Sequence, residues 1–390
     1  MPMSHILSQR FLQISKDIFR VKTSLNEPKV HLQAAMDWLC AAQDADSSGG
    51  VSRSYALRFM KAHGRSGWLA PYPETTGYII PTFFNYGKFI QDSSYITRAI
   101  RMAEWESNVQ MSNGAVQGGV IGFPPSPTIF NTGQVLFGWS RAFQETGDKQ
   151  FLDSALAGAD FLVETQDSDG SWQKFGSQYA RSGINVYDAR TAWGLLEVFA
   201  ISGNEVYREA GRKNLEFVLT QQYANGWFAQ CCLDDNLHPL LHTIAYTMEG
   251  LLEGGIILKE KKFVEASRKT AESLLLRQRS DGSLAGRFDA AWNECGKWSC
   301  LTGDAQTAIV LFRLYEIYGE KKYYEAGKRL NAYLMGTQDI TSSNTGIRGG
   351  IKGSFPIWED YGTYEYLNWA AKFFVDAVLL EISHEGSRGK

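Results

Sequence analysis

The feature that most constrains the fold of this chain is an internal repeat that runs along its whole length. A glutamine followed by a glycine-containing turn recurs six times, and three successive intervals are 56 residues long. The six glutamines are Gln43, Gln110, Gln166, Gln222, Gln278 and Gln338. In four units a glycine lies four residues after the glutamine and follows Asn or Asp, which tolerate the positive φ of a tight turn. This repeat predicts an array of one supersecondary unit stacked against its own copies.

Each unit is predicted to contain two helices. Before the glutamine, an aromatic residue lies fifteen positions upstream, a small residue eleven upstream and a second aromatic five upstream, as in Phe151, Ala155 and Phe161. These offsets fall near one helical stripe, so this helix is amphipathic. A more apolar stretch precedes it, for example 132–144, and ends at a glycine that is typical of a helix C-terminus, here Gly147. The unit is therefore a helical hairpin with a buried inner helix and a half-exposed outer helix.

The predicted helices are sufficient to close a ring. Outer helices end at the six glutamines, and inner helices begin near residues 75, 132, 189, 243, 304 and 363. The first outer helix, about 29–43, has no inner helix before it, and the last inner helix, about 363–381, has no outer helix after it. We expect these two helices to pair and seal the ring. The predicted fold is an all-α (α/α)6 toroid of twelve helices in two concentric layers. Residues 26–390 form its single domain, and residues 1–25 form an N-terminal helix or arm outside it.

Charge and hydropathy argue against several classes of protein. The chain has 39 basic and 42 acidic residues, so it lacks the electrostatic footprint of a nucleic-acid-binding protein. No run of eighteen apolar residues spans a membrane, and the N-terminus has no apolar core of a secretory signal. Five cysteines with no CxxC pair favour reduced thiols. We therefore expect a cytoplasmic protein with no nucleic-acid partner, no membrane span and no metal or other cofactor. Its oligomeric state is left open.

The polar starts of the inner helices are where we expect a functional site. These helices run parallel, so their N-termini and free backbone N–H groups meet at one mouth of the ring, which favours an anionic ligand. The candidate catalytic residues are Glu74, Asp188, His242, Tyr246 and Asp304. The candidate substrate-binding residues are Asn131, Gln134, Tyr187, Arg190, Trp298, Trp358, Tyr361, Tyr364 and Glu365. The tryptophans among them lie in loops that feed the mouth and offer flat faces to a sugar ring.

Several of these residues also have a structural interpretation. Asp188, Asp304 and Asn131 are equally suited to cap the helices that they begin. Arg190 lies in an apolar helix, where its charge needs either an internal ion pair or an anionic ligand. His242 opens an apolar helix and is interpreted as a satisfied core histidine, as a general acid or base, or as a metal ligand.

Two sets of residues resemble isoprenoid enzymes that share the toroid scaffold. Residues 166–172, QDSDGSW, resemble the QW repeat of terpene cyclases, but the chain lacks their DxDD acid motif. Asp188-Ala189-Arg190 and Leu241-His242-Thr243 look similar to the zinc-bearing strings of protein prenyltransferase β-subunits. Arg190 stands where their zinc-bound cysteine would be, and a guanidinium cannot ligate zinc. The resemblance therefore implies the scaffold, and an isoprenoid enzyme is one alternative function.

A third resemblance covers most of the chain. The strings PETTGYIIPT, FNTGQVLFGW and NGWF resemble the VpsJ-like proteins of bacterial exopolysaccharide and O-antigen loci. This resemblance implies a cytosolic role in surface-glycan metabolism. Other glycan-active toroids point the same way, namely unsaturated glucuronyl hydrolases, N-acylglucosamine 2-epimerases, glucuronyl C5-epimerases and several polysaccharide lyases. Their catalytic motifs do not transfer to individual residues here.

The leading hypothesis is a carbohydrate-active enzyme that acts on an acidic, uronate-containing oligosaccharide or polysaccharide. Arg190 would hold the uronate carboxylate, and His242 with Tyr246 one turn later would move protons as base and acid. Elimination would make the protein a lyase and reprotonation on the other face an epimerase. Alternatively, Glu74, Asp188 or Asp304 would form a carboxylate pair for glycoside hydrolysis. A non-catalytic glycan-binding or assembly protein is the other alternative.

Overall fold

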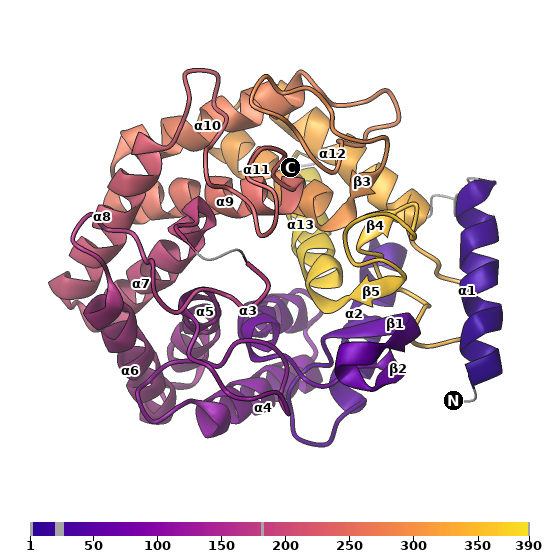
Figure 1. Ribbon diagram of the computed structural model, residues 1–390, viewed down its shortest axis with the longest axis horizontal. Helices are drawn as coiled ribbons and strands as arrows, with labels where there is room; N and C mark the ends of the chain where they lie inside the picture. Colours follow the sequence, from indigo (N-terminus) through magenta and orange to yellow (C-terminus); the bar gives the residue numbers. More distant parts are fainter. Residues whose placement is uncertain (1–2, 20–26, 181–182, 389–390) are drawn as a thin grey trace.

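A computed structural model describes residues 3–19, 27–180 and 183–388 of the chain, and it contains the predicted ring (Figure 1). The inner layer consists of α3 (Pro73–Ile90), α5 (Ile129–Thr146), α7 (Ala189–Ser202), α9 (Leu241–Leu258), α11 (Leu301–Tyr318) and α13 (Asn368–Arg388). The outer layer consists of α2 (Pro28–Asp44), α4 (Ser93–Val109), α6 (Lys149–Thr165), α8 (Glu205–Thr220), α10 (Lys261–Leu275) and α12 (Lys321–Thr337). The prediction of twelve helices in two concentric layers is confirmed.

The ring closes as expected. Helix α13 packs against α2, which pairs the last inner helix with the first outer one. Helix α1 (Met3–Ile18) lies outside the ring (Figure 1). Its buried Asp17 pairs with Lys352 Nζ at 2.5 Å, and Lys16 pairs with Asp339 at 2.7 Å. These bonds attach α1 to the ring; residues 1–2 and 20–25 of the expected 1–25 arm lie outside the described part of the chain.

The repeated glutamine has a clear structural role. The Gln166 side-chain amide donates to Gly170 O in its own turn at 3.1 Å and to Ala210 O in the next outer helix at 2.9 Å. The Gln110 and Gln278 amides make the equivalent two bonds, one to the glycine carbonyl of their own turn and one to the next outer helix. One side chain therefore fixes a turn and joins two successive hairpins, which explains why glutamine recurs with the repeat.

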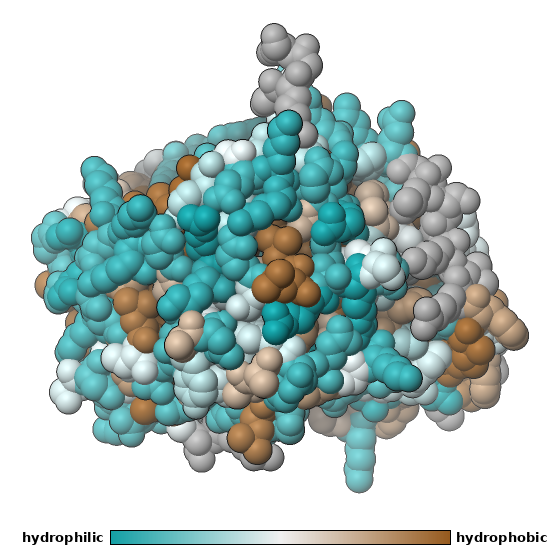
Figure 2. Space-filling model, turned by 90° about the horizontal axis from the view of Figure 1, so that it is seen from above, coloured by the Kyte–Doolittle hydropathy of each residue, from teal (hydrophilic) through white to brown (hydrophobic). Residues whose placement is uncertain are grey.

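Glycines let the inner helices approach closely. A Cβ added at Gly77 would lie 2.6 Å from Val135 Cα, and one added at Gly133 would lie 2.6 Å from a methyl group of Thr191. Both clashes are between neighbouring inner helices, so any larger residue would push the ring apart. The buried faces of the two layers supply the core, whereas the side of the ring in Figure 2 is mainly hydrophilic with small, separate hydrophobic patches.

Short strands in the loops were not predicted from the repeat. Strands β1 (Ser54–Met60), β2 (Arg65–Trp68) and β5 (Glu365–Leu367) form an antiparallel sheet in the order β2-β1-β5. Strands β3 (Ser299–Cys300) and β4 (Ser354–Phe355) form a second pair, and 3₁₀ turns cover Lys61–His63 and Val186–Asp188. The pairing of β1 with β5 joins loops from the first and last units of the ring. Within the described residues, no helix combines the length and the hydropathy that crossing a bilayer requires.

Candidate functional site

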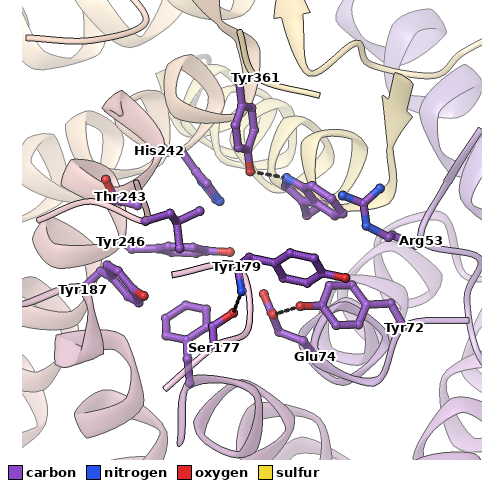
Figure 3. A pocket seen from close by; sticks show the side chains of 13 residues that line it. Arg53, Tyr72, Glu74, Ser177, Tyr179, Tyr187, His242, Thr243, Tyr246 and Tyr361 are labelled. Carbon is purple, nitrogen blue, oxygen red and sulfur yellow. Dashed lines mark hydrogen bonds between the residues drawn. The ribbon is translucent and has the colours of Figure 1, made fainter. Parts of the chain in front are cut away.

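A cavity of about 220 Å³ lies at the mouth of the ring where the inner helices begin (Figure 3). Residues at or just before the starts of α3, α5, α7, α9 and α13 contribute to it, and loops supply the rest. The lining residues are Arg53, Tyr72, Glu74, Phe130, Ser177, Tyr179, Tyr187, Leu233, His242, Thr243, Tyr246, Tyr361 and Trp369. The cavity therefore lies at the mouth where the polar helix starts predict a functional site.

Glu74 is the carboxyl group of the cavity. It lies in the first turn of α3, and the Tyr72 hydroxyl donates a hydrogen bond to its Oε2 (Figure 3). Burial raises the pKa of Glu74 to about 7, against the opposing effects of the Tyr72 hydrogen bond and the positive charges of Arg53 and Arg190. A carboxyl group with this pKa is present in both protonation states near neutral pH, so it can accept or donate a proton.

His242 faces the cavity from the first turn of α9. Its Nδ1 lies 2.6 Å from Gln306 Oε1, and because an amide oxygen only accepts, Nδ1 carries the proton and Nε2 is the free acceptor. Burial lowers the pKa of His242 to about 3, so the ring is neutral. Figure 3 shows Glu74 and His242 pointing into the cavity from opposite sides.

Arg53 supplies the positive charge of the cavity. Its Nη1 pairs with Glu365 Oε2 at 2.5 Å, and Glu365 Oε2 also accepts from the Ser54 hydroxyl at 2.6 Å. The guanidinium carbon lies 5.0 Å from the centre of the Trp369 ring, within the range of a cation–π interaction. The buried Nε of Arg53 has no hydrogen-bond partner among the described residues. Arg53 itself lines the cavity, and a planar guanidinium is suited to a carboxylate ligand.

Aromatic rings form the walls of the cavity. The Phe130 ring centre lies 5.1 Å from that of Tyr187 and 5.0 Å from that of Tyr246. Burial holds the pKa of Tyr187, Tyr246 and Tyr361 well above the usual value, so their hydroxyls stay protonated. Flat apolar faces edged by hydroxyl groups suit the faces and the hydroxyls of a sugar ring.

The structure brings five of the predicted residues together around this cavity: Glu74, Tyr187, His242, Tyr246 and Tyr361. Each lies at or near the start of an inner helix or in the loop before the last one. Within the described residues, no group of three or more His, Cys, Asp and Glu side chains is arranged to hold a metal ion.

Asp304, Asp188 and Asn131 lie outside the cavity. Asp304 is fully buried and accepts a hydrogen bond from the Leu284 backbone N–H at 3.1 Å, which ties a turn to α11. Asn131 donates to Gln117 O at 3.0 Å in the same way. Asp188 accepts from the Thr191 hydroxyl at 3.4 Å and makes no side-chain cap bond, and its burial raises its pKa to about 8. These polar groups connect backbone segments, or pack beside them, behind the cavity wall.

Arg190 and Gln134 also lie away from the cavity. Arg190 Nη1 pairs with Glu249 Oε2, and its Nε donates to Gln134 Oε1 at 2.7 Å. Arg190 as a whole is 2% exposed. Of the two interpretations of Arg190, the structure therefore shows the internal ion pair, and the cation in the cavity is Arg53 instead.

The remaining predicted binding residues surround the site without lining it. Trp298 is buried against Gly286, and Trp358 packs half-buried against the core. The Tyr364 ring lies 5.2 Å from the Arg10 guanidinium carbon. Glu365 acts through Arg53, which it holds in place.

The residue positions missed from the sequence are mainly in loops. Arg53 precedes β1 and Tyr179 lies in the loop before α7, where no helical periodicity marks a position. Tyr72 and Trp369 lie close to predicted helix starts. Their position next to polar helix starts is the sequence signal that could have identified them as cavity residues. The pairing of β1 with β5, which brings Arg53 beside Glu365, joins segments about 310 residues apart and has no local signature.

No protein-family model matches the sequence, and neither does any curated protein. Solved structures do match the fold. An unsaturated glucuronyl hydrolase specific for heparin superposes with a TM-score of 0.73 over 92% of this chain and 98% of its own, at 16% identity. Cellobiose 2-epimerase from Bacillus thermoamylovorans gives 0.70 over 90% and 98%, at 11% identity, and a sugar epimerase from a ruminal bacterium gives 0.68 over 96% and 99%, at 14% identity. The fold is the (α/α)6 toroid of these sugar enzymes. At such identities the similarity concerns the fold alone.

Proposed function

We propose that this protein is a carbohydrate-active enzyme that binds an acidic terminal sugar in the cavity and epimerises a carbon next to its carboxylate. The observation that carries the proposal is that Glu74, whose pKa is about 7, and the cation Arg53 line the same aromatic cavity. A uronate needs a cation for its carboxylate, flat walls for its ring and a proton-transfer group of tuned pKa. The toroid enzymes with the same fold include glucuronyl hydrolases and sugar epimerases, which supports the choice of substrate class.

The reaction follows from the opposite positions of Glu74 and His242. Ionised Glu74 takes the proton from the ring carbon next to the carboxylate, and the electron pair moves into the carboxylate to give an enediolate. Arg53 stabilises the added negative charge. The protonated Tyr246 hydroxyl on the other face returns a proton to that carbon, which gives the inverted sugar, while the neutral Nε2 of His242 beside it acts as an acceptor. One carbon–hydrogen bond breaks and one forms; Glu74 then releases its proton to water and Tyr246 regains one from water, so no other reactant is consumed.

A two-carboxylate hydrolase is less well supported. Such enzymes place two carboxyl groups on either side of the scissile bond. Among the described residues that line the cavity, Glu74 carries the single carboxyl group, while Asp188 and Asp304 lie behind the walls. Lyase chemistry would begin with the same proton abstraction and would differ in losing a leaving group instead of regaining a proton. An isoprenoid substrate fits poorly, because a carbocation would meet the positive charge of Arg53.

The size of the cavity favours a terminal sugar over an internal one. About 220 Å³ is below the common range for drug-sized ligands, and it suits a single ring. A role on bacterial surface glycans and the likeness to VpsJ-like proteins stay predictions from the sequence.

The test is substrate discrimination with matched sugars. Oligosaccharides that end in glucuronate are compared with the same oligosaccharides ending in glucose, using the wild type, Arg53→Met and Glu74→Gln. We expect turnover of the acidic sugar alone, a raised KM in Arg53→Met, and lost turnover with retained binding in Glu74→Gln. Equal turnover of both sugars would contradict the role of Arg53. Binding without turnover by the wild type would support the non-catalytic alternative.

A further inference from the structure

The hairpin of β1 and β2 extends from the rim of the proposed active-site cavity (Figure 1). Arg53, directly before β1, and Tyr72, shortly after β2, both line the cavity. The two strands pair antiparallel, and a 3₁₀ turn at Lys61–His63 forms the tip between them. Because both ends of the hairpin belong to the cavity wall, its side chains lie next to the path by which a bound chain leaves the cavity.

The tip of the hairpin contacts a second loop of the rim. The His63 ring stacks on Phe123, with ring centres 5.1 Å apart and planes 26° apart. Phe123 lies in the loop before α5, where the Ile121 N–H donates to Pro71 O at 2.9 Å, next to Tyr72. The hairpin and this loop are therefore joined both at the tip and near the base, which holds the hairpin in place beside the cavity.

The hairpin carries positive charge that no acidic side chain compensates. Arg58 on β1, Lys61 at the tip and Arg65 on β2 make no ion pair with any described residue. Residues 53–68 include no Asp or Glu. Lys61 and Arg65 are exposed, and Arg58 is half-buried. These three cations are available to an anionic ligand.

Two of these cations act on groups beside the cation of the cavity. Burial raises the pKa of Glu365, the partner of Arg53, but the charges of Arg53 and Arg58 contribute to lowering it overall. Burial lowers the pKa of His63, and the charges of Arg53 and Arg65 lower it further against the effect of Glu365. The positive field of the cavity therefore continues onto the hairpin.

Another part of the rim, before α9, is acidic. Asp234 and Asp360 follow and precede the cavity residues Leu233 and Tyr361 in the sequence. Both carboxylates pair with the same cation, Arg287, at 2.9 and 2.6 Å. Two acids on one guanidinium leave an excess of negative charge. An acidic chain that leaves the cavity is therefore repelled on this side and attracted to the hairpin.

We propose that Arg58, Lys61 and Arg65 form a second subsite, which binds an anionic group on the sugar that follows the terminal one. The inference rests on the proposed function, because the terminal sugar must occupy the cavity for its neighbour to reach the rim. A cavity of about 220 Å³ leaves that neighbour outside. The anionic group is a carboxylate or a sulfate ester, each of which accepts charge-assisted hydrogen bonds from guanidinium and ammonium groups. The substrate is then a chain with negative charge on successive sugars.

Calorimetric titration with matched disaccharides tests this inference. Each probe ends in glucuronate, and its second sugar is glucose, glucose 6-sulfate or glucuronate. All titrated proteins carry Glu74→Gln, so that the probes stay unchanged during the measurement. The comparison of the three probes separates a sulfate ligand from a carboxylate ligand.

The test variant adds three substitutions in the hairpin: Arg58→Gln, Lys61→Gln and Arg65→Gln. A matched control removes three exposed cations of the outer helices that likewise make no ion pair with a described residue: Lys149→Gln, Lys269→Gln and Lys321→Gln. Both variants lose the same net charge, so a general electrostatic effect would appear in both.

We expect at least one charged second sugar to lower Kd about tenfold relative to glucose, since three exposed ion pairs each contribute a small amount. This advantage should disappear in the hairpin variant, persist in the control, and shrink in about 0.5 M sodium chloride because exposed charges are screened. The inference is overturned if neither charged second sugar binds more tightly than glucose, if the hairpin variant keeps the advantage, or if the control loses it equally.

Turnover by the wild type separates a failure of this inference from a failure of the proposed function. If the probe with glucose as its second sugar binds but is not epimerised, the proposed chemistry fails, and the comparison of Kd values still decides the role of the hairpin. If that probe is epimerised and a charged second sugar brings no gain in affinity, the hairpin inference alone fails. Absence of binding by all three probes would contradict both.

Discussion

The titratable side chains at the inner helix starts differ because their immediate surroundings differ. Glu74 has one hydroxyl donor in an apolar cavity, so its pKa rises to about 7. His242 is buried and remains neutral. Asp304 is also buried, but one of its carboxylate oxygens accepts a hydrogen bond from the backbone N–H of Leu284. A position at a helix start therefore identifies candidate residues, and the hydrogen-bond partners of each residue determine whether it is available to transfer a proton.

The first residue-scale prediction concerns the pH profile. If ionised Glu74 abstracts a proton, kcat/KM rises with pH through about 7. Glu74→Gln should lose this dependence and about 100-fold or more of the activity, whereas Glu74→Asp should retain a titrating limb. Initial rates between pH 5 and 9 provide the measurement, and an unchanged profile in Glu74→Gln would exclude Glu74 as the base.

The same carboxyl group makes folding stability depend on pH. Its pKa is 4.5 in a model peptide and about 7 in the folded protein, so the folded state binds more protons between these values. Its contribution to stability is full below pH 4.5 and declines as pH rises through 7. Urea unfolding at pH 5 and pH 8 should show a smaller difference in Glu74→Gln than in the wild type. An equal or larger difference would contradict the raised pKa.

The buried ion pair of Arg190 makes a stability prediction of its own. Arg190→Met leaves Glu249 buried without its partner, which should lower the free energy of unfolding by about 3–5 kcal/mol. Arg208→Met, which breaks an exposed pair with Glu205, should cost about 1 kcal/mol or less. Urea unfolding of both variants tests this contrast, and equal costs would argue against the ion pair as a stabilising element of the ring centre.

Helix pairs and turns were predictable from the sequence because the glutamine that joins them recurs with the repeat. The strands were not, because β1 and β5 pair across the closure of the ring and carry no repeat. The same distinction holds for the residues of the candidate site. Residues on helix starts, such as His242 and Tyr187, were found, whereas Arg53 depends on that strand pairing. Long-range pairing leaves no periodic mark in a single sequence.

At this scale the glutamine bonds are testable. Gln166→Ala removes hydrogen bonds to Gly170 O and Ala210 O, and should lower the free energy of unfolding by about 1–3 kcal/mol. Gln173 is exposed in the following loop, so Gln173→Ala serves as the control and should change stability by about 0.5 kcal/mol or less. Similar losses in both variants would contradict the role assigned to the repeated glutamine.

The whole molecule is a closed ring, and different side chains line the two ends of its central region. The mouth at the inner helix starts holds Glu74, His242 and Arg53, and the opposite end holds Lys372 and Arg141. Parallel inner helices produce this polarity, because equivalent positions on successive helices reach the same end. Tyr78, Tyr246 and Arg190 lie between the two ends, with the hydroxyls of the two tyrosines 3.4 Å apart.

The most direct test of the central claim is solvent deuterium exchange. The wild type is incubated in deuterated water with an oligosaccharide that ends in glucuronate, and proton NMR follows the carbon next to the carboxylate. We predict deuterium at that carbon, inversion of its configuration with no linkage broken, and loss of both in Glu74→Gln. A cleaved linkage without deuterium at that carbon would contradict epimerisation and point to a hydrolase. An unchanged sugar that nevertheless binds would contradict catalysis altogether.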